Sequence, residues 1–137
     1  MNLRNISVLL SLVLLLVACQ SNPVTGEDVA VAGGSYKNVS SRELNTLLKD
    51  KDFIFMNVHI PFAGNIAGTD LSIPYDQIEQ NLSQLPADKD ARIVLYCRSG
   101  RMSQIAAEKL VALGYTDVWN LNGGMVDWEK EGFELQK

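Results

Sequence analysis

A cysteine followed closely by two arginines is the part of this sequence whose residue types could do chemistry. Cys97 precedes Arg98 directly, and Arg101 follows three residues later, after Gly100. The thiolate is the reactive form of cysteine, and neighbouring cationic groups stabilise its negative charge. A cysteine that only packs in a core does not require two arginines and a glycine beside it. The spacing therefore favours a nucleophilic role for Cys97 over that of a buried structural cysteine.

The segments on either side of Cys97 predict a strand and a helix. Residues 92–96 are a continuous apolar, β-rich run of the kind found in strands that are covered on both faces. From Met102 onward, apolar side chains recur at helical spacing, and Gly114 supplies a C-terminal stop. In a turn from a strand into a helix, backbone N–H groups and the positive end of the helix dipole point toward the space before the first helical residue. We expect the sulfur of Cys97 to lie there, in a cradle of loop amides.

Two other strand patterns are expected to end at the same edge of a sheet. Residues 53–58 precede His59, and residues 117–121 precede Gly123 and its neighbours. Strands that alternate with helices predict right-handed crossovers and a parallel sheet with helices on both faces. Ligands of such sheets bind at the carboxyl ends of the strands. Cys97, His59 and Gly123 should therefore lie along one rim.

The remaining periodic segments have structural interpretations. Ser40 and Glu43 form a capping-box pattern, which predicts a helix over residues 41–49. Residues 75–85 are weakly helical, with apolar side chains whose expected role is packing.

Two segments of the chain carry a resemblance to a known family. They are Cys97-Arg98-Ser99-Gly100-Arg101-Met102-Ser103 and Asn122-Gly123-Gly124-Met125 with Trp128. The first resembles the active-site loop of the rhodanese-like family, and the second resembles its closing Gly-Gly-x-x-x-Trp segment. The likeness extends over about residues 40–133. It implies a single rhodanese-like α/β domain with a five-stranded parallel sheet and helices on both faces.

The chemistry that this loop favours is sulfur transfer through a persulfide. Thiolate Cys97 would attack the outer sulfur of a small anionic donor such as thiosulfate, and a thiol or other nucleophilic acceptor would then take that sulfur. Negative charge accumulates at each stage, and the loop amides and guanidinium groups can stabilise it. The expected substrate-binding residues are Arg98, Ser99, Gly100, Arg101, Met102, Ser103 and His59.

Two positions depart from the pattern of the family. Met102 stands where the family commonly has an arginine, which predicts slow turnover of thiosulfate. Asn57-Val58-His59 replaces a common Asp-Val-Arg. His59 could be an acid–base group or a donor to a bound anion, but a strand-end side chain held by a backbone carbonyl is the favoured alternative. A thiolate that attacks a sulfane sulfur needs no proton removed.

Other functions remain open at this point. A cysteine in a cradle of amides also suits a phosphatase or an arsenate reductase, but the phosphatases place an arginine six residues after the cysteine, where this chain has Ser103. A non-catalytic module that uses the rhodanese fold for binding or thiol redox sensing is the alternative from another class.

The N-terminal residues predict export and lipid attachment. Arg4 precedes an apolar run of 13 residues, which is shorter than the roughly 20 that span a bilayer. Residues 1–18 are therefore expected to be a signal peptide. Their end, Leu16-Val17-Ala18 before Cys19, resembles the bacterial lipobox, which implies a lipidated Cys19 and an anchor in the cell envelope. By the same resemblance, Gln20 favours the outer membrane, facing the periplasm, where the host has one. A plain secretory signal with an incidental cysteine is the alternative.

Composition and charge bound the rest of the chain. Residues 19–35 are rich in turn residues and predict a lipidated tether, which leaves residues 36–137 as one folded domain. Without residues 1–18 the chain has 11 basic and 16 acidic residues, so nucleic acid is not an expected partner. One histidine and one available thiol do not make a metal-ligand set, and no cofactor is expected.

Overall fold

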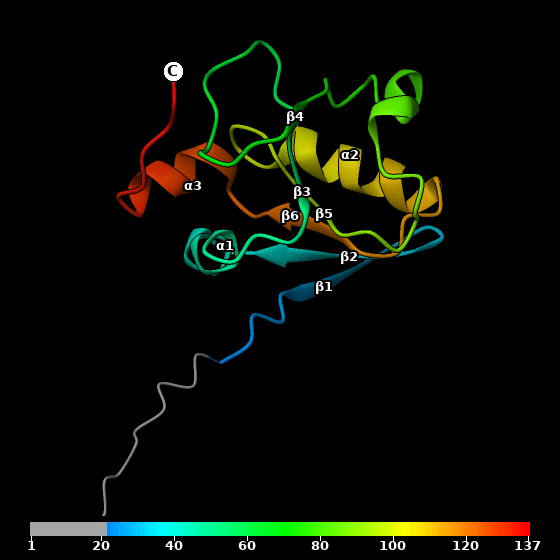
Figure 1. The fold of residues 1–137 in the computed structure, drawn as a ribbon, viewed down its shortest axis with the longest axis horizontal. Helices are drawn as coiled ribbons and strands as arrows, with labels where there is room; N and C mark the ends of the chain where they lie inside the picture. The colour runs from blue at the N-terminus through cyan, green and yellow to red at the C-terminus, as the bar shows by residue number, and fades with distance from the viewer. Residues whose placement is uncertain (1–21) are drawn as a thin grey trace, which may run out of the picture.

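The computed structural model describes residues 22–137, in which strands and helices alternate (Figure 1). The predicted signal peptide and the lipidation at Cys19 lie outside these residues. The elements are β1 Glu27–Val31, β2 Gly34–Val39, α1 Ser41–Leu48, β3 Ile54–Asn57, β4 Leu71–Ser72, the 3₁₀ helix η1 Glu79–Gln84, β5 Ile93–Tyr96, α2 Arg101–Ala112, β6 Val118–Leu121 and α3 Gly124–Lys130.

One mostly parallel sheet of six strands forms the centre of the domain, in the order β1-β2-β6-β5-β3-β4. Each neighbouring pair is parallel except β1 with β2. The α/β class with helices on both faces is confirmed, whereas the expected five-stranded parallel sheet is wrong by one strand and one antiparallel pair.

The extra strand comes from the segment that was expected to be a tether. Val31 pairs with Gly34 in the register of β1 and β2, so Ala32 and Gly33 form a two-residue hairpin turn. Gly33 has φ +87°, and glycine adopts this left-handed conformation without the steric cost that other residues incur. The glycines that suggested a flexible linker therefore close a hairpin, and the tether prediction fails from Glu27 onward.

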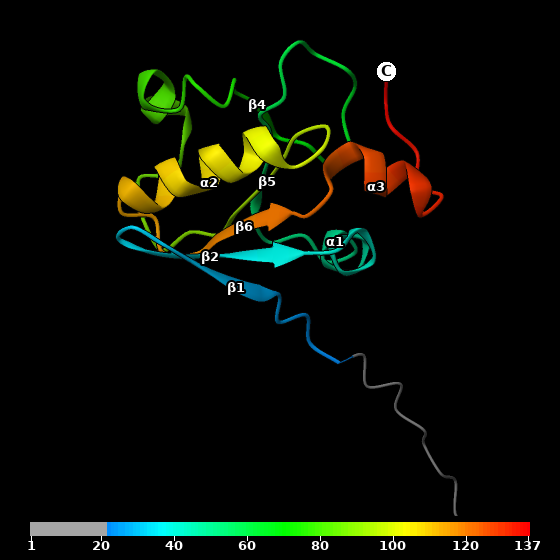
Figure 2. The same cartoon turned by 180° about the vertical axis from the view of Figure 1, so that it is seen from behind.

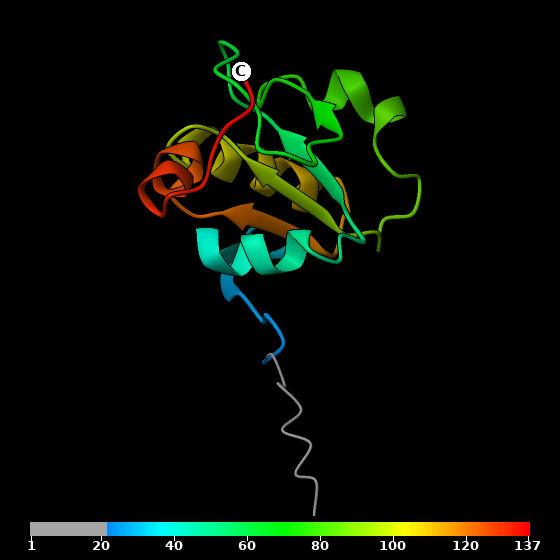
Figure 3. The same ribbon diagram turned by 60° about the vertical axis from the view of Figure 1, so that its left-hand side comes forward.

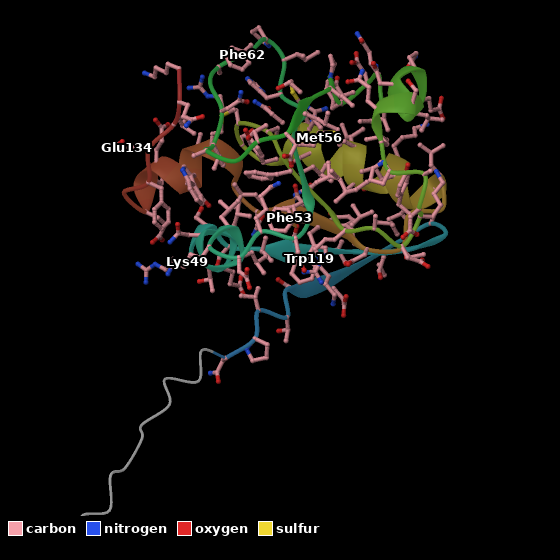
Figure 4. The ribbon with its side chains drawn as sticks, viewed as in Figure 1. Lys49, Phe53, Met56, Phe62, Trp119 and Glu134 are labelled. Carbon is pink, nitrogen blue, oxygen red and sulfur yellow. The ribbon has the colours of Figure 1, made fainter. Side chains whose placement is uncertain are left out.

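Side chains alternate between the two faces of the sheet and form two apolar clusters. In β5, Ile93 and Leu95 join the cluster under α2, and Val94 and Tyr96 join the cluster under α1 and α3. Figures 1 and 2 show α2 on one side of the sheet and α1 on the other. β3 follows the same rule, because Met56 belongs to the α2 cluster and Phe55 to the opposite one, which also contains Phe53 just before the strand (Figure 4).

The helix boundaries follow local signals in the sequence. The capping box of α1 is present, since the Ser40 side chain accepts from Glu43 N and the Glu43 side chain accepts from Ser40 N. At the end of α2, Gly114 N donates to Val111 O and Tyr115 N donates to Leu110 O. This is the Schellman pattern that the glycine stop predicted. Residues 75–85, in contrast, contain only η1. No helix in residues 22–137 is long and apolar enough to cross a membrane.

Candidate functional site

Cys97 lies at the carboxyl end of β5, in the turn that leads into α2. Its side chain is buried, and its Sγ accepts a hydrogen bond from Gly100 N at 3.0 Å. Ser103 Oγ lies 3.4 Å from the same sulfur. The predicted cradle thus takes the form of one loop amide and one side-chain hydroxyl, both of which can donate to a thiolate.

Gly100 makes the turn possible. It is the N-cap residue of α2 and has φ +109°, a conformation that side-chain-bearing residues rarely adopt. This conformation lets the Gly100 N–H point back at Sγ while Gly100 O accepts from Gln104 N at 3.0 Å and so starts the helix.

The first turn of α3 holds the Cys97 loop from the other side. Met125 N donates to Cys97 O and Val126 N donates to Arg98 O, both at 2.9 Å. A Cβ on Gly124 would lie 2.5 Å from Cys97 O and 2.7 Å from Arg98 O. Only glycine permits this approach. The two segments that carried the family resemblance are therefore one bonded unit, a contact that the sequence did not reveal.

The two arginines of the loop lie in different surroundings. Arg98 is exposed and lines a hollow of about 180 Å³ on the α3 side, together with Ala63, Met125, Glu129, Leu135 and Lys137. Arg101 is exposed at the first position of α2, and Ser99 is exposed between them. Within residues 22–137, neither guanidinium lies within 4 Å of a carboxylate oxygen. Both charges are therefore available to an anion.

Met102 and Ser103 turn inward from the first turn of α2. Met102 is half-buried and packs against the apolar cluster that contains Cys97. Ser103 is fully buried, and its Oγ also lies 3.0 Å from Gly100 O. The methionine thus fills space beside the helix start, and the serine contacts the sulfur.

His59 follows β3 and lies within electrostatic reach of the loop. Burial, and secondarily the positive charge of Arg98, lowers the pKa of His59 from its usual value. Its Nδ1 is buried and has no hydrogen-bond partner among the described residues. The favoured expectation, a ring held by a backbone carbonyl, is therefore not met at this nitrogen.

Two buried side chains hold the loop after β3, which forms a wall of the site. Asn57 was expected at this strand end as a departure from the family pattern, whereas Tyr96 was not expected at the site. Asn57 Nδ2 donates to Gly64 O at 3.0 Å and to Asn65 Oδ1 at 2.9 Å, and its Oδ1 accepts from His59 N. Tyr96 OH accepts from Ile66 N at 3.0 Å. A polar residue inside the apolar run of β3 was the available signal for Asn57, because buried amides require partners.

The wall continues into the C-terminal segment. Asn65 and Gln136 form an antiparallel bridge, with both N–H···O bonds at 2.7 Å. Figure 3 shows the C-terminal residues beside the loop that follows β3. The exposed Phe62 lies at the outer part of this loop (Figure 4). No group of three or more His, Cys, Asp or Glu side chains in residues 22–137 is arranged to hold a metal ion.

Comparison with known proteins places these features in a family. Residues 30–131 match the rhodanese-like domain. A sulfurtransferase of Allochromatium vinosum is 32% identical over 100 residues, which cover 71% of this chain and 92% of that protein. A tRNA uridine(34) hydroxylase of Escherichia coli is 26% identical over 102 residues, which cover 70% of this chain but only 29% of that enzyme.

Solved structures support the same family assignment. The crystal structure of a rhodanese-like domain protein from Staphylococcus aureus is 30% identical, with a TM-score of 0.61, and the match covers 74% of this chain and 99% of that one. A rhodanese-related protein of Thermoplasma volcanium is 25% identical, with a TM-score of 0.62, and the match covers 73% and 97% of the two chains. The chain therefore belongs to the rhodanese-like domain family and is a homologue of sulfurtransferases.

Proposed function

We propose that this chain moves a sulfane sulfur from a small anionic donor to a nucleophilic acceptor through a persulfide on Cys97. The observation that carries the proposal is the Cys97 sulfur at the start of α2, with Gly100 N–H bonded to it at 3.0 Å. A preorganised donor at a helix start stabilises a sulfur anion without further rearrangement.

Two displacements make up the reaction. In the first, thiolate Cys97 attacks the outer sulfur of a thiosulfate-like donor, the donor's S–S bond breaks, and its electron pair leaves with sulfite. In the second, an acceptor such as a thiolate attacks the outer sulfur of the persulfide, and the electron pair of the broken bond returns to Cys97 Sγ. Neither step requires a metal or a cofactor.

Thiosulfate is proposed to be a slow donor. Met102 stands where the family commonly has arginine and packs against the core, so the loop has no cation besides Arg98 and Arg101. Arg101 is then the charge closest to the start of α2 that can attract the departing sulfite. A charge-assisted hydrogen bond contributes roughly 1.5–3 kcal/mol.

The test is the intact mass of the described domain after incubation with thiosulfate. The proposal expects the addition of one sulfur atom, its removal by cyanide, and no addition in Cys97→Ser. Cyanide removes the outer sulfur as thiocyanate, so both steps are measured in one sample.

A non-catalytic binding or thiol redox-sensing module is the second candidate. It is supported by the burial of Cys97, whose side chain is only 1% exposed. An unchanged mass in the thiosulfate experiment, together with partner binding that survives Cys97→Ala, would favour this candidate. A rate on p-nitrophenyl phosphate that disappears in Cys97→Ala would instead indicate a phosphatase.

We further propose that the chain is anchored in the bacterial cell envelope through a lipidated Cys19, with residues 1–18 removed. Two or three acyl chains anchor a protein firmly, whereas one is marginal. Cys19→Ala is expected to give soluble or unprocessed protein in cell fractionation. Membrane recovery equal to that of the wild type would contradict the anchor.

A further inference from the structure

Ser103 presents a buried hydroxyl beside the reactive sulfur. The residue has no exposed surface, and its Oγ lies 3.4 Å from Cys97 Sγ and 3.0 Å from Gly100 O. A hydroxyl group carries one hydrogen, so it can donate fully to only one of these acceptors at a time. The choice between them depends on the charge of the sulfur, because an ionised acceptor forms the stronger bond.

The carbonyl of Gly100 can release the serine at little cost. It also accepts the backbone hydrogen bond from Gln104 N at 3.0 Å. When the hydroxyl turns away, this bond remains, and no buried carbonyl is left without a partner. The other donor at the sulfur, Gly100 N–H, is part of the backbone and keeps its position.

We propose that Ser103 stabilises the thiolate of Cys97 by transferring its hydroxyl hydrogen bond from Gly100 O to Sγ, and that this matters most when the thiolate is the leaving group. The inference rests on the proposed sulfur transfer and deepens it. When cyanide discharges the persulfide, a bond forms between the cyanide carbon and the outer sulfur, and the S–S bond breaks. The electron pair stays on Sγ, and the proton of the outer sulfur passes to solvent as thiocyanate is released. Ser103 and Gly100 N–H receive the new charge.

Loading and discharge should depend on Ser103 to different degrees. In loading, a stabilised thiolate is more abundant but less nucleophilic, so the two effects partly cancel. In discharge, the same hydrogen bond improves the leaving group, and nothing offsets its loss. A residue with only a packing role would not separate the two steps in this way.

The experiment compares Ser103→Ala, Ser103→Thr and Ser103→Val in the described domain. Carboxamidomethylation of Cys97 is followed against pH, and single-turnover loading by thiosulfate and discharge to cyanide are timed separately. Ser103→Ala is expected to move the midpoint of the alkylation profile to higher pH by about one unit and to slow discharge about 10-fold, with a smaller effect on loading. Ser103→Thr should exceed Ser103→Val in discharge rate, because the two side chains share a shape and differ in the hydroxyl.

Ser41→Ala is the matched control, because Ser41 is also a buried helical serine but its hydroxyl bonds no described residue. Its alkylation profile and discharge rate should equal those of the wild type. An unchanged profile and discharge rate in folded Ser103→Ala would overturn the proposal. Equal discharge rates in Ser103→Thr and Ser103→Val would also overturn it. This comparison holds even if Ser103→Ala does not fold. A wild-type protein that never gains sulfur would contradict the proposed function. Because alkylation needs no sulfur donor, its pH profile would still test the role of Ser103.

Discussion

Arg101 and Met102 are neighbours whose side chains have different environments. Arg101 is exposed at the start of α2, and Met102 packs against the cluster that contains Cys97. The direction of a side chain, rather than its distance from Cys97 in the sequence, therefore decides which of them can reach an anionic donor.

We expect Arg101→Ala to lower kcat/KM for thiosulfate about 10-fold, because it removes one charge-assisted hydrogen bond to the donor or to departing sulfite. Arg98→Ala should have a smaller effect, since Arg98 lines the hollow on the α3 side. The measurement is steady-state thiocyanate formation with cyanide as acceptor. Arg42→Ala, which removes an arginine paired with Glu131, is the control. A larger loss in Arg98→Ala than in Arg101→Ala would reverse this assignment.

His59 should make stability depend on pH. Burial and Arg98 lower its pKa in the folded chain, so below about pH 6.5 the unfolded chain binds more protons than the folded one. Stability is therefore lost as the pH falls through this range. Urea unfolding at about pH 7.5 and about pH 5.5 should show a larger loss for the wild type than for His59→Gln. Arg98→Ala should reduce this pH-dependent loss of stability. An equal loss in the wild type and in His59→Gln would refute the prediction.

At the scale of elements, the site is a joint between β5, α2 and α3. Met125 N and Val126 N of α3 bond the carbonyls of Cys97 and Arg98, and Gly100 turns the chain into α2. Each helix thus presents its N-terminal amides to a different part of the same loop. Moving α3 would move the backbone that carries Cys97.

Gly124→Ala should destabilise the domain by about 3 kcal/mol or more, because its Cβ would overlap Cys97 O and the carbonyl group of Arg98 at φ +59°. Gly132→Ala is the matched control, since Gly132 has φ +87° but open space around it. It should incur only the conformational cost of about 1 kcal/mol. Urea unfolding measures both, and equal losses would mean that the close approach of α3 is not needed.

At the scale of the whole molecule, the sheet separates two apolar clusters, and Cys97 belongs to the one under α2. The Arg98 hollow is lined by Ala63, Met125 and Leu135, which belong to or pack on the cluster under α1 and α3. The sulfur and the Arg98 hollow are therefore associated with opposite faces of the sheet. β1 extends the sheet at one edge, where Val29 and Val31 pack against the α2 cluster.

The double variant Val29→Ala and Val31→Ala should cost about 1–2 kcal/mol, because each valine buries part of its side chain when β1 pairs with β2. Glu27→Ala, on the same strand but exposed, should change stability little. Unfolding followed by tryptophan fluorescence tests both. Equal unfolding free energies in the double variant and in Glu27→Ala would indicate that residues 27–31 do not take part in cooperative folding. That result is expected of a tether.

The sequence by itself determined the parts of this protein that depend on neighbouring residues. Ser40 and Glu43 bond one another across three residues to begin α1, and Gly114 ends α2 within its own last turn. The apolar run of β5 leads into the glycine turn of the Cys97 loop in the same way. The periodicity of apolar residues and the capping of helices depend on neighbouring residues, so both can be predicted before the fold is known.

Only the tertiary structure decided which distant segments meet at Cys97. The bonds of α3 to the loop join residues separated by 28 positions, as from Cys97 to Met125. Tyr96 OH accepts from Ile66 N, 30 positions away, and so ties the loop after β3 to the end of β5. β1 escaped prediction because a half-buried edge strand of five residues has little periodicity, and its pairing with β2 defines it. Spacing in the chain shows which face a side chain occupies, but the partner on that face depends on the path of the backbone between them.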